Sequence, residues 1–380
     1  MFWNKRVYLD VAAAFPVRPE AARAFTRAAA LFGNPSSPHE EGRVAKEALE
    51  QARTAIARLT EVKSDDIIFT SGATEANAIA ILGSVHAGDH ALYLPSAHAS
   101  IVENMRLLPK CGVTIEPLPV HDGRVDAEAL KRMLRPETKL VSMDAVCGET
   151  GTIWNTREVH GVLVNHAPQA HLHVDASQAA LSEKILRAHF SADLLTFDAA
   201  KVGGMRGVGC LIAHRTIPLT ALYRGGGQER EVRPGTESPA LAAAFAAALT
   251  ASVAERELFR ARAVHDRALL TTFITTHCLD VCINAGKETV PHILNISFPG
   301  RDTDYLVALL DEAGYAVSTR SACETDSADG SRAVFVLCGD AERATSTLRI
   351  SWHAGNNSTE LRRFGHALVR AVRVIDNASR

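Results

Sequence analysis

Hydrophobic and polar positions along residues 38 to 250 follow a pattern that predicts helices separated by short buried strands. The clearest helix is expected over 38–60, where apolar residues recur every three or four positions. They form one stripe that we expect to face a core, made of Val44, Ala48, Ala52, Ile56 and Leu59. The first strand is expected directly after this helix, at 67–69.

Short apolar runs bounded by polar or glycine-containing turns continue along the same region. Fully buried strands have this pattern because neither of their faces meets water. The runs are ALYLP, KLVSM, HLHV, LLTF and GVGCLIA. Their spacing is that of βαβ units, so the sequence predicts an α/β fold with a mainly parallel sheet.

An alanine-rich segment over 238–277 separates this region from the rest of the chain. It contains no glycine, and no proline after Pro239, so it is expected to be one long helix connecting two units. The later segments HILNISF, TDYLVALLDEAG, YAVSTRSAC and STLRISW, with an amphipathic helix from Thr359, predict a smaller α+β unit. We therefore expect a large domain over 15–255, and a small domain made of 1–14 and 256–380.

Composition and charge narrow the class of protein. Hydrophobic residues make up 47% of the 380 residues and charged residues 22%, as in ordinary globular chains. The net charge of −2 and the lack of a basic run argue against a nucleic-acid or membrane-surface binder. No uncharged window reaches the roughly 18 residues that cross a bilayer. A small-molecule or protein partner is expected, and the chain is expected to be cytoplasmic.

The seven cysteines are scattered, which favours a reducing compartment over a disulfide-stapled secreted domain. Cys278 and Cys282 in CLDVC have a spacing that resembles half of a metal site, but no second pair of cysteine or histidine ligands follows. No metal is expected.

Two residues at the ends of predicted strands are the first candidates for chemistry. Asp175 ends the strand in HLHVDASQ, and Lys201 follows the next strand in LLTFDAAKVGG. Ligands of open α/β sheets collect at the carboxyl ends of the strands. A pyridoxal phosphate enzyme needs a Schiff-base lysine and a carboxylate beside the pyridine nitrogen. Each residue alone has a simpler explanation, as a helix N-cap or as a solvated charge.

The turn SGATEAN, at 71–77, is a candidate phosphate-binding cup. A strand runs there into a small, hydroxyl-rich turn and then a helix, whose free N–H groups and positive dipole end attract anions. Gly72, Ala73 and Thr74 are expected to form the cup, although an ordinary capped helix start explains the same residues.

Several separated motifs follow one another in a recognisable order. They are SGATEAN, PSAHASIVEN, HVDASQ, the Lys201 segment, GGGQEREVRPGTES, HILNISF, RSAC and STLRISW. In this order the chain resembles the cysteine desulfurases of the class V aminotransferase superfamily, which are fold-type I pyridoxal phosphate enzymes. The resemblance implies a seven-stranded sheet sandwiched by helices in the large domain, and it implies the conversion of L-cysteine to L-alanine.

The resemblance also implies roles for single residues around the cofactor. Lys201 would form the Schiff base, Asp175 would pair with the pyridinium, and Gln178 would donate to the ring hydroxyl oxygen. His98 would stack on the ring and help to transfer protons. Ala73 would belong, with Thr74, to the phosphate cup.

Further roles concern the substrate and the partners. Cys323 would take the sulfur as a persulfide, and Arg349 would bind the substrate carboxylate. Thr236 would reach the cofactor phosphate of a second subunit, which implies a homodimer. The persulfide would pass to an acceptor protein, such as an iron–sulfur scaffold or a tRNA thiolation protein.

The chain departs from the family pattern at several positions. Asp198, Ala199 and Ala200 stand where a serine and a histidine usually contact the phosphate, and Cys147 and Gly148 replace a pair of asparagines. Arg320 replaces a small residue before SAC. A carboxylate close to a phosphate is unfavourable unless it turns away or pairs with a cation. We therefore expect a divergent member.

Three alternatives stay open at this point. The first is another pyridoxal phosphate reaction, including that of a selenocysteine lyase. The second is a non-catalytic scaffold that has lost strong cofactor binding. The third is a nucleotide-binding module, suggested by the glycines of GGMRGVG; it is disfavoured because these glycines precede a strand instead of opening a helix.

Overall fold

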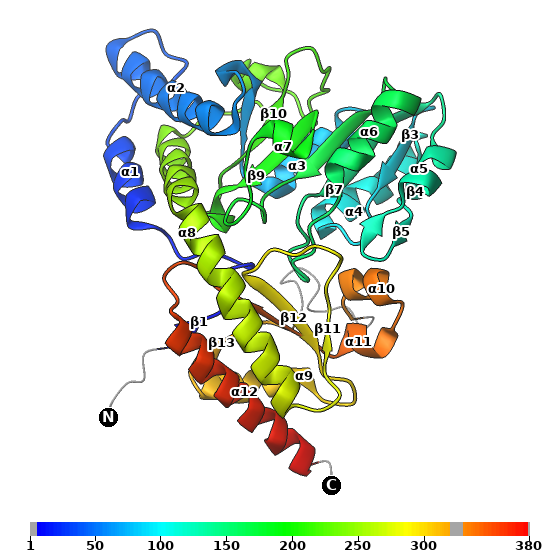
Figure 1. The fold of residues 1–380 in the computed structure, drawn as a ribbon. Helices are drawn as coiled ribbons and strands as arrows, with labels where there is room; N and C mark the ends of the chain where they lie inside the picture. Colours follow the sequence, from blue (N-terminus) through cyan, green and yellow to red (C-terminus); the bar gives the residue numbers. More distant parts are fainter. Residues whose placement is uncertain (1–5, 320–329, 379–380) are drawn as a thin grey trace.

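The computed structural model describes residues 6–319 and 330–378. Two β-sheets organise the chain: a seven-stranded sheet in the upper part of Figure 1 and a three-stranded sheet in the lower part. The long helix α8 (Pro239–His277) runs from one part to the other. This is the α/β architecture that the hydrophobic pattern predicts.

The seven-stranded sheet has the strand order β2-β10-β9-β8-β7-β3-β4. All its neighbouring strands are parallel except β10, which is antiparallel to both β2 and β9. A mainly parallel sheet is therefore confirmed. The strands are β2 (Ile67–Thr70), β3 (His90–Tyr93), β4 (Thr114–Pro117), β7 (Thr138–Asp144), β8 (His171–Asp175), β9 (Leu194–Asp198) and β10 (Gly209–Ala213).

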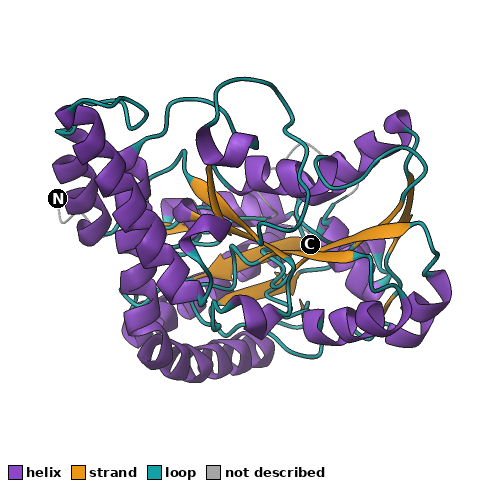
Figure 2. Cartoon of the chain, turned by 90° about the horizontal axis from the view of Figure 1, so that it is seen from above, coloured by secondary structure: helices purple, strands orange, loops and turns teal. Residues whose placement is uncertain are grey.

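Helices lie on both sides of this sheet, as the view from above shows (Figure 2). Most central strand residues are fully buried between the helices, which explains why these strands are continuous apolar runs in the sequence. The helices of this part are α1 (Pro19–Ala29), α2 (Glu40–Thr60), α3 (Ala73–Leu82), α4 (Ala99–Leu107), α5 (Ala127–Met133), α6 (Thr156–His166) and α7 (Arg187–Phe190).

The predicted apolar stripe of α2 is partly wrong. Ala52 and Ile56 are buried as expected, but Val44 is exposed and Ala48 only half-buried, and their neighbours Ala45 and Leu49 pack inward instead. Valine is more hydrophobic than alanine, so the sequence pattern favoured Val44 over Ala45. Helix α2 packs against α8, and small inward-facing side chains such as Ala45 let packed helices approach closely.

The lower part contains strands from both ends of the chain. The antiparallel sheet joins β11 (Cys282–Ile283), β12 (Ile293–Ser297) and β14 (Thr347–Ser351). Strand β1 (Val7–Tyr8) pairs in parallel with β13 (Tyr315–Ala316). The helices of this part are α9 (Thr303–Glu312), α10 (Arg332–Cys338), α11 (Ala341–Thr345) and α12 (Ser358–Ala378).

Short elements complete the chain. A small hairpin joins β5 (Val120–His121) to β6 (Arg124–Val125). The 3₁₀ turns are η1 (Ser64–Asp66), η2 (Leu108–Cys111), η3 (Ala199–Lys201) and η4 (Gln228–Glu231). Turn η3 follows β9 directly and so places the candidate lysine at the carboxyl end of the sheet.

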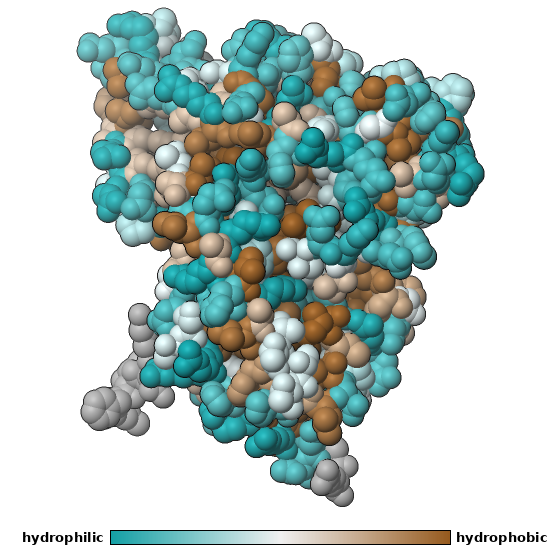
Figure 3. Space-filling view, viewed as in Figure 1, coloured by the Kyte–Doolittle hydropathy of each residue, from teal (hydrophilic) through white to brown (hydrophobic). Residues whose placement is uncertain are grey.

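Helix α8 confirms the alanine-rich connector predicted from the sequence. It is one unbroken helix of 39 residues, which at about 1.5 Å per residue spans roughly 58 Å. The expected domain boundary at 255 falls inside this helix, so the division into 15–255 and the two flanking pieces stays a prediction. In the part of the chain that the structure describes, no helix is long and apolar enough to span a membrane. The face seen in Figure 3 is largely hydrophilic, with scattered hydrophobic patches.

A buried ion pair fastens the glycine-rich segment 225–238 to the large sheet. The Arg53 guanidinium of α2 contacts the Glu229 carboxylate through two hydrogen bonds of 2.9 and 2.7 Å. Glu229 also accepts from the N–H of Phe69 in β2, at 2.7 Å. Both charged side chains are at least nine-tenths buried, so each depends on the other for compensation.

Replacing Glu229 by glutamine is expected to destabilise the protein by about 3 kcal/mol, because the buried Arg53 charge loses its partner. Urea unfolding measures the change. Glu20→Gln is the control, since Glu20 pairs with Arg23 on the surface and should change stability by less than about 0.5 kcal/mol. Equal effects of the two substitutions would contradict the prediction.

Candidate active site

A cavity of about 230 Å³ opens at the carboxyl ends of β7, β8 and β9. It brings together most of the residues that the sequence analysis singled out, although they come from distant parts of the chain. Those that line it are Ala73, Thr74, His98, Asp175, Gln178, Lys201 and Arg349. Thr236 is exposed and does not line it. Cys323 and Arg320 lie outside the described residues.

Asp175 is held at the end of β8 by two donors. The Asn77 side-chain amide donates to Oδ2 at 2.8 Å, and the N–H of Ser177 donates to Oδ1 at 2.9 Å. The carboxylate is 6% exposed. Its direction is thus fixed by α3 on one side and by its own turn on the other.

A hydrogen-bonded chain connects Asp175 to His98. The same Asn77 amide donates to Ser100 Oγ at 2.8 Å, and Ser100 Oγ lies 2.8 Å from His98 Nδ1. The N–H of Ser100 also donates to Nδ1, at 3.2 Å. Because Nδ1 accepts, the neutral imidazole carries its proton on Nε2. The network therefore sets the tautomer of the expected stacking residue.

His173 lies two residues before Asp175 in the same strand and is fully buried. Its ring lies between Ser142 Oγ at 2.7 Å and Thr196 Oγ1 at 3.1 Å. Burial lowers the pKa of His173 to about 4, against the opposing effect of Asp175. His173 is therefore neutral near pH 7. Its two ring nitrogens form hydrogen bonds with the neighbouring strands β7 and β9, so its role is structural.

Lys201 and Gln178 meet at the N-terminal segment of the chain. Lys201 Nζ donates to the carbonyl oxygens of Ala12 and Ala13 at 3.0 and 2.8 Å. Gln178 Nε2 donates to the Ala12 carbonyl at 2.8 Å. Segment 10–13 thus forms one wall of the cavity and positions the lysine amine.

Gly148 explains how Gln178 fits. A Cβ at this position would lie 3.0 Å from Gln178 Nε2 and 3.3 Å from its Cδ. The departure from the paired asparagines therefore gives Gln178 room that a larger residue would take away.

Arg349 reaches the cavity from β14 of the lower sheet and is 2% exposed. Its guanidinium donates to Asp10 Oδ1 at 2.8 Å and to the Gly148 carbonyl at 3.1 Å. Its Nε has no partner among the described residues. Arg349 is thus a buried cation with donor capacity left for an anionic ligand.

The Asp198 side chain lies at the start of α3, where the phosphate cup is expected. Its Oδ2 accepts from the N–H of Ala73 at 2.9 Å, and its Oδ1 accepts from the N–H of Ala200 at 2.8 Å. It does not turn away from the expected phosphate cup. The carboxylate binds the first N–H of helix α3 itself.

Comparison with known proteins identifies the family. The model of the family described as aminotransferase class-V matches residues 7–364. The chain belongs to this aminotransferase class-V family. It is 33% identical over 357 residues to the cysteine desulfurase IscS of Dictyoglomus turgidum, which covers 92% of this chain and 90% of the relative. The resemblance to cysteine desulfurases that the motifs suggested is confirmed.

Solved structures agree with this assignment. A NifS-like protein superposes with a TM-score of 0.90 at 26% identity, covering 97% of this chain and all of the other. A structure described as SspA in complex with cysteine has a TM-score of 0.77 at 25% identity, covering 91% of this chain and 98% of the other. The α/β fold expected for this class-V family member is therefore confirmed.

Sequence reasoning missed three charged residues in the cavity of this class-V protein: Asp144, Glu149 and Arg332. Asp144 ends β7 and pairs in register with Asp175 of β8. An acid at the end of a buried strand was the very signal that identified Asp175, and it applies equally to Asp144. Arg332 gave no such signal, because α10 approaches the cavity only through the tertiary fold.

Asp144 is buried beside another carboxyl group. Burial, and secondly the charge of Asp175, raise the pKa of Asp144 to about 8. Its Oδ1 has no hydrogen-bond partner among the described residues. At pH 7 this side chain is therefore mainly neutral, and the cavity does not carry two adjacent carboxylates.

Replacing Asp144 by asparagine is expected to change how stability depends on pH. The unfolded chain loses this proton near pH 4 and the folded protein near pH 8, so the group's contribution falls as pH rises between them, by at most about 1.4 kcal/mol per unit. The variant should gain stability over wild type from pH 5 to pH 8. Urea unfolding at both pH values measures this gain, with the exposed Asp122→Asn as control. Parallel pH profiles for Asp144→Asn and wild type would contradict it.

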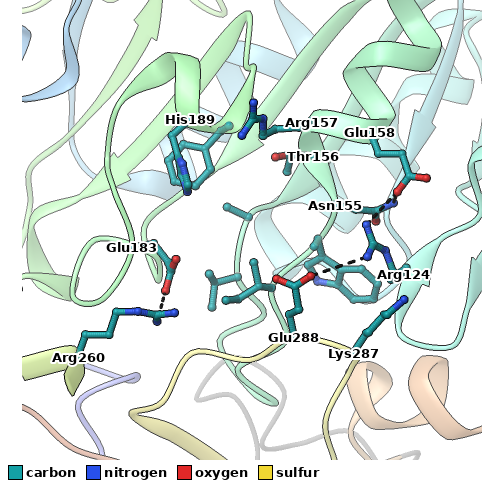
Figure 4. Close-up of a pocket in the computed structure, with 15 residues that line it drawn as sticks. Arg124, Asn155, Thr156, Arg157, Glu158, Glu183, His189, Arg260, Lys287 and Glu288 are labelled. Atoms are coloured by element: carbon teal, nitrogen blue, oxygen red, sulfur yellow. Dashed lines mark hydrogen bonds and ion pairs between the residues drawn. The ribbon is translucent and has the colours of Figure 1, made fainter. Parts of the chain in front are cut away.

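A second cavity, of about 320 Å³, is lined in part by residues 153–158 (Figure 4). None of the predicted site residues lines it. Its charges largely pair with one another, as Arg260 does with Glu183 and Arg124 with Glu158. It is therefore a weaker candidate for catalysis.

The cysteines that the structure describes divide by burial. Cys147, Cys210 and Cys278 are buried, whereas Cys111 is exposed. Cys282 and Cys338 are half-buried. Within residues 6–319 and 330–378, no group of three or more His, Cys, Asp or Glu side chains gathers to hold a metal.

Proposed function

We propose that this chain is a pyridoxal-phosphate-dependent cysteine desulfurase. It converts L-cysteine to L-alanine and takes the sulfur as a persulfide on Cys323. The observation that carries the proposal is that Lys201, Asp175 and Arg349 line one cavity, although they come from three separate parts of the chain. An amine, a carboxylate and a guanidinium in one cavity are the groups that a cofactor aldehyde, its ring nitrogen and a substrate carboxylate each require.

The cavity residues fit the ring of the cofactor. Asp175 offers a rigidly held carboxylate for the pyridinium nitrogen, Lys201 offers the amine, and His98 lies at the start of α4 on the cavity wall. When bound, the pyridinium ring withdraws electrons from the substrate carbon and so permits cleavage of the carbon–sulfur bond. The phosphate end fits less well because Asp198 is there.

Each of these residues has a defined task. Lys201 is oriented by the Ala12 and Ala13 carbonyls, which keep its amine at the cavity wall. His98, whose Nδ1 accepts from the Ser100 N–H, carries its proton on Nε2 and can donate it to a bound group. Gln178, whose Nε2 donates to the Ala12 carbonyl in this structure, would supply the hydrogen bond to the ring hydroxyl oxygen.

Arg349 would bind the carboxylate of L-cysteine. Its planar guanidinium suits a two-pronged contact with a carboxylate. The Asp10 carboxylate already accepts a hydrogen bond from the Arg349 guanidinium. The carboxylate of L-cysteine would therefore replace that of Asp10 on Arg349 when the substrate binds. Asp10 thereby keeps the buried cation compensated between turnovers.

The proposed partners follow from the family. The persulfide passes to a sulfur-acceptor protein, an iron–sulfur scaffold or a tRNA thiolation protein, and no direct nucleic-acid contact is involved. The protein acts as a cytoplasmic homodimer in which Thr236, exposed in the single chain, contacts the cofactor phosphate of the partner. The large domain, 15–255, holds the cofactor, and the small domain brings Arg349 and Cys323 to it.

The absorbance spectrum of the purified protein with pyridoxal phosphate tests the proposal. We expect a visible band that changes on addition of L-cysteine, together with formation of alanine. A colourless protein that forms no alanine would contradict catalysis and support the scaffold alternative. The structural observation that favours that alternative is the Asp198 carboxylate at the expected phosphate cup. A coloured protein that uses selenocysteine but not cysteine would support the lyase alternative.

A further inference from the structure

Asp198 lies beside the phosphate cup because of the register of the sheet. Gly209 of β10 is paired with Asp198 of β9 on one side and with Thr70 of β2 on the other. A Cβ on Gly209 would lie 2.8 Å from the Gly72 Cα. The missing side chain at Gly209 therefore lets the turn after β2 come close to the end of β9.

The Asp198 carboxylate occupies the positive end of helix α3. Its Oδ2 accepts the hydrogen bond of the Ala73 N–H and would lie 3.1 Å from a Cβ on Gly72. Anions are stabilised at this end of a helix. Asp198 already supplies such an anion, and it comes from a strand 125 residues away in the chain.

Among the residues that the structure describes, Asp198 takes part in no ion pair with Lys or Arg. Lys201 points to the carbonyls of segment 10–13, and Arg349 is paired with Asp10. A phosphate group would add up to about two negative charges next to a carboxylate, and their repulsion is strong in a partly buried site.

We propose that Asp198 is a specificity-determining residue that replaces part of the cofactor's phosphate-binding shell, so that the protein holds its cofactor chiefly through the ring. At the cup itself, Thr74 at the start of α3 keeps its N–H and hydroxyl available for a phosphate, since no hydrogen bond joins either group to another described residue. The inference rests on the proposed function. It means that the phosphate adds little to affinity and that pyridoxal binds nearly as well as pyridoxal phosphate.

The test compares the binding of these two aldehydes to the apoprotein by absorbance titration. In wild type we expect dissociation constants within about fivefold of each other. In Asp198→Asn, which removes the charge and keeps the shape, pyridoxal phosphate should bind at least about tenfold more tightly, while the affinity for pyridoxal stays within about twofold. Asp198→Ser, which opens the cup further, should show the same selectivity.

The control is Asp193→Asn. Asp193 also accepts a main-chain N–H, that of Leu172, but it does not line the cavity. It should change neither constant. Thermal unfolding of the apoproteins confirms that the variants are folded, so that a weaker fold is not mistaken for a weaker site.

Two results would overturn the inference in distinguishable ways. If wild type binds pyridoxal phosphate at least about a hundredfold more tightly than pyridoxal and Asp198→Asn changes neither value, the phosphate is well anchored despite Asp198 and only this inference fails. If neither aldehyde gives a Lys201-dependent band in any of the proteins, the proposed function fails and the inference with it.

Discussion

Replacing Lys201 by alanine is expected to abolish the visible band and to lower alanine formation from L-cysteine by at least about 1,000-fold. The amine is the covalent attachment point that no other described residue of the cavity offers, since the remaining cations, Arg332 and Arg349, carry guanidinium groups. The measurement is the spectrum after addition of pyridoxal phosphate, together with alanine produced per minute.

Two further variants make this result specific. Lys201→Arg keeps a positive charge near the Ala12 and Ala13 carbonyls but has no reactive amine, so it should also be colourless. Lys184→Ala removes an exposed lysine and should behave as wild type. Lys201→Ala also loses two hydrogen bonds to carbonyls, at a cost of about 1 kcal/mol each, so its folding is checked by urea unfolding. A persistent band in Lys201→Ala would assign the cofactor to another residue.

The parts of the fold that were predictable are those in which local pattern and packing agree. Strand β9 is a continuous apolar run because both its faces are buried, and α8 is continuous because alanine dominates a stretch without breakers. Strand β4 was missed. It lies at the sheet edge and is only half-buried, so its sequence lacks the apolar run that marks the central strands.

The sequence predicted those active-site residues that lie within a local motif at the end of a strand. Asp175 and Lys201 each end a strand, and the parallel sheet necessarily brings such ends together. The network from Asp175 through Asn77 and Ser100 to His98 has no such signature, because it depends on how α3 packs against α4. Residues that act through tertiary contacts therefore had to come from the structure.

Asp198 is a second residue whose surroundings the sequence alone did not determine. The sequence indicated that a carboxylate stands near the expected phosphate, and it left two outcomes open: the side chain turns away, or it pairs with a cation. The structure shows a third outcome, in which the carboxylate accepts the Ala73 N–H that was expected to bind phosphate. Only the register of β9, β10 and β2 decides between them.

Replacing Cys323 by serine is expected to lower alanine formation from L-cysteine by at least about 100-fold and to remove the protein-bound persulfide. The sulfur acceptor has to be a thiol that ionises readily, because the thiolate is the nucleophile. Cys323 lies outside the described residues, so the structural argument concerns its rivals. The rival that lines the cavity is Cys147.

Cys147 is unsuited to the task. Burial, followed by the negative charges of Asp144 and Glu149, raises the pKa of Cys147 to about 12. Its thiolate is therefore scarce near pH 7, although the thiol is close to the substrate. Cys147→Ser should retain most of the alanine formation and the persulfide, which makes it the matched control for Cys323→Ser.

The two variants together decide where the sulfur goes. Persulfide is detected by the mass of the protein after brief exposure to L-cysteine, and alanine is measured in the same samples. Loss of both signals in Cys323→Ser alone supports the proposed mechanism. If Cys147→Ser loses them instead, the buried thiol is the acceptor, and the cavity must then lower the pKa of Cys147 when substrate binds, through the cations Arg332 and Arg349 on its wall.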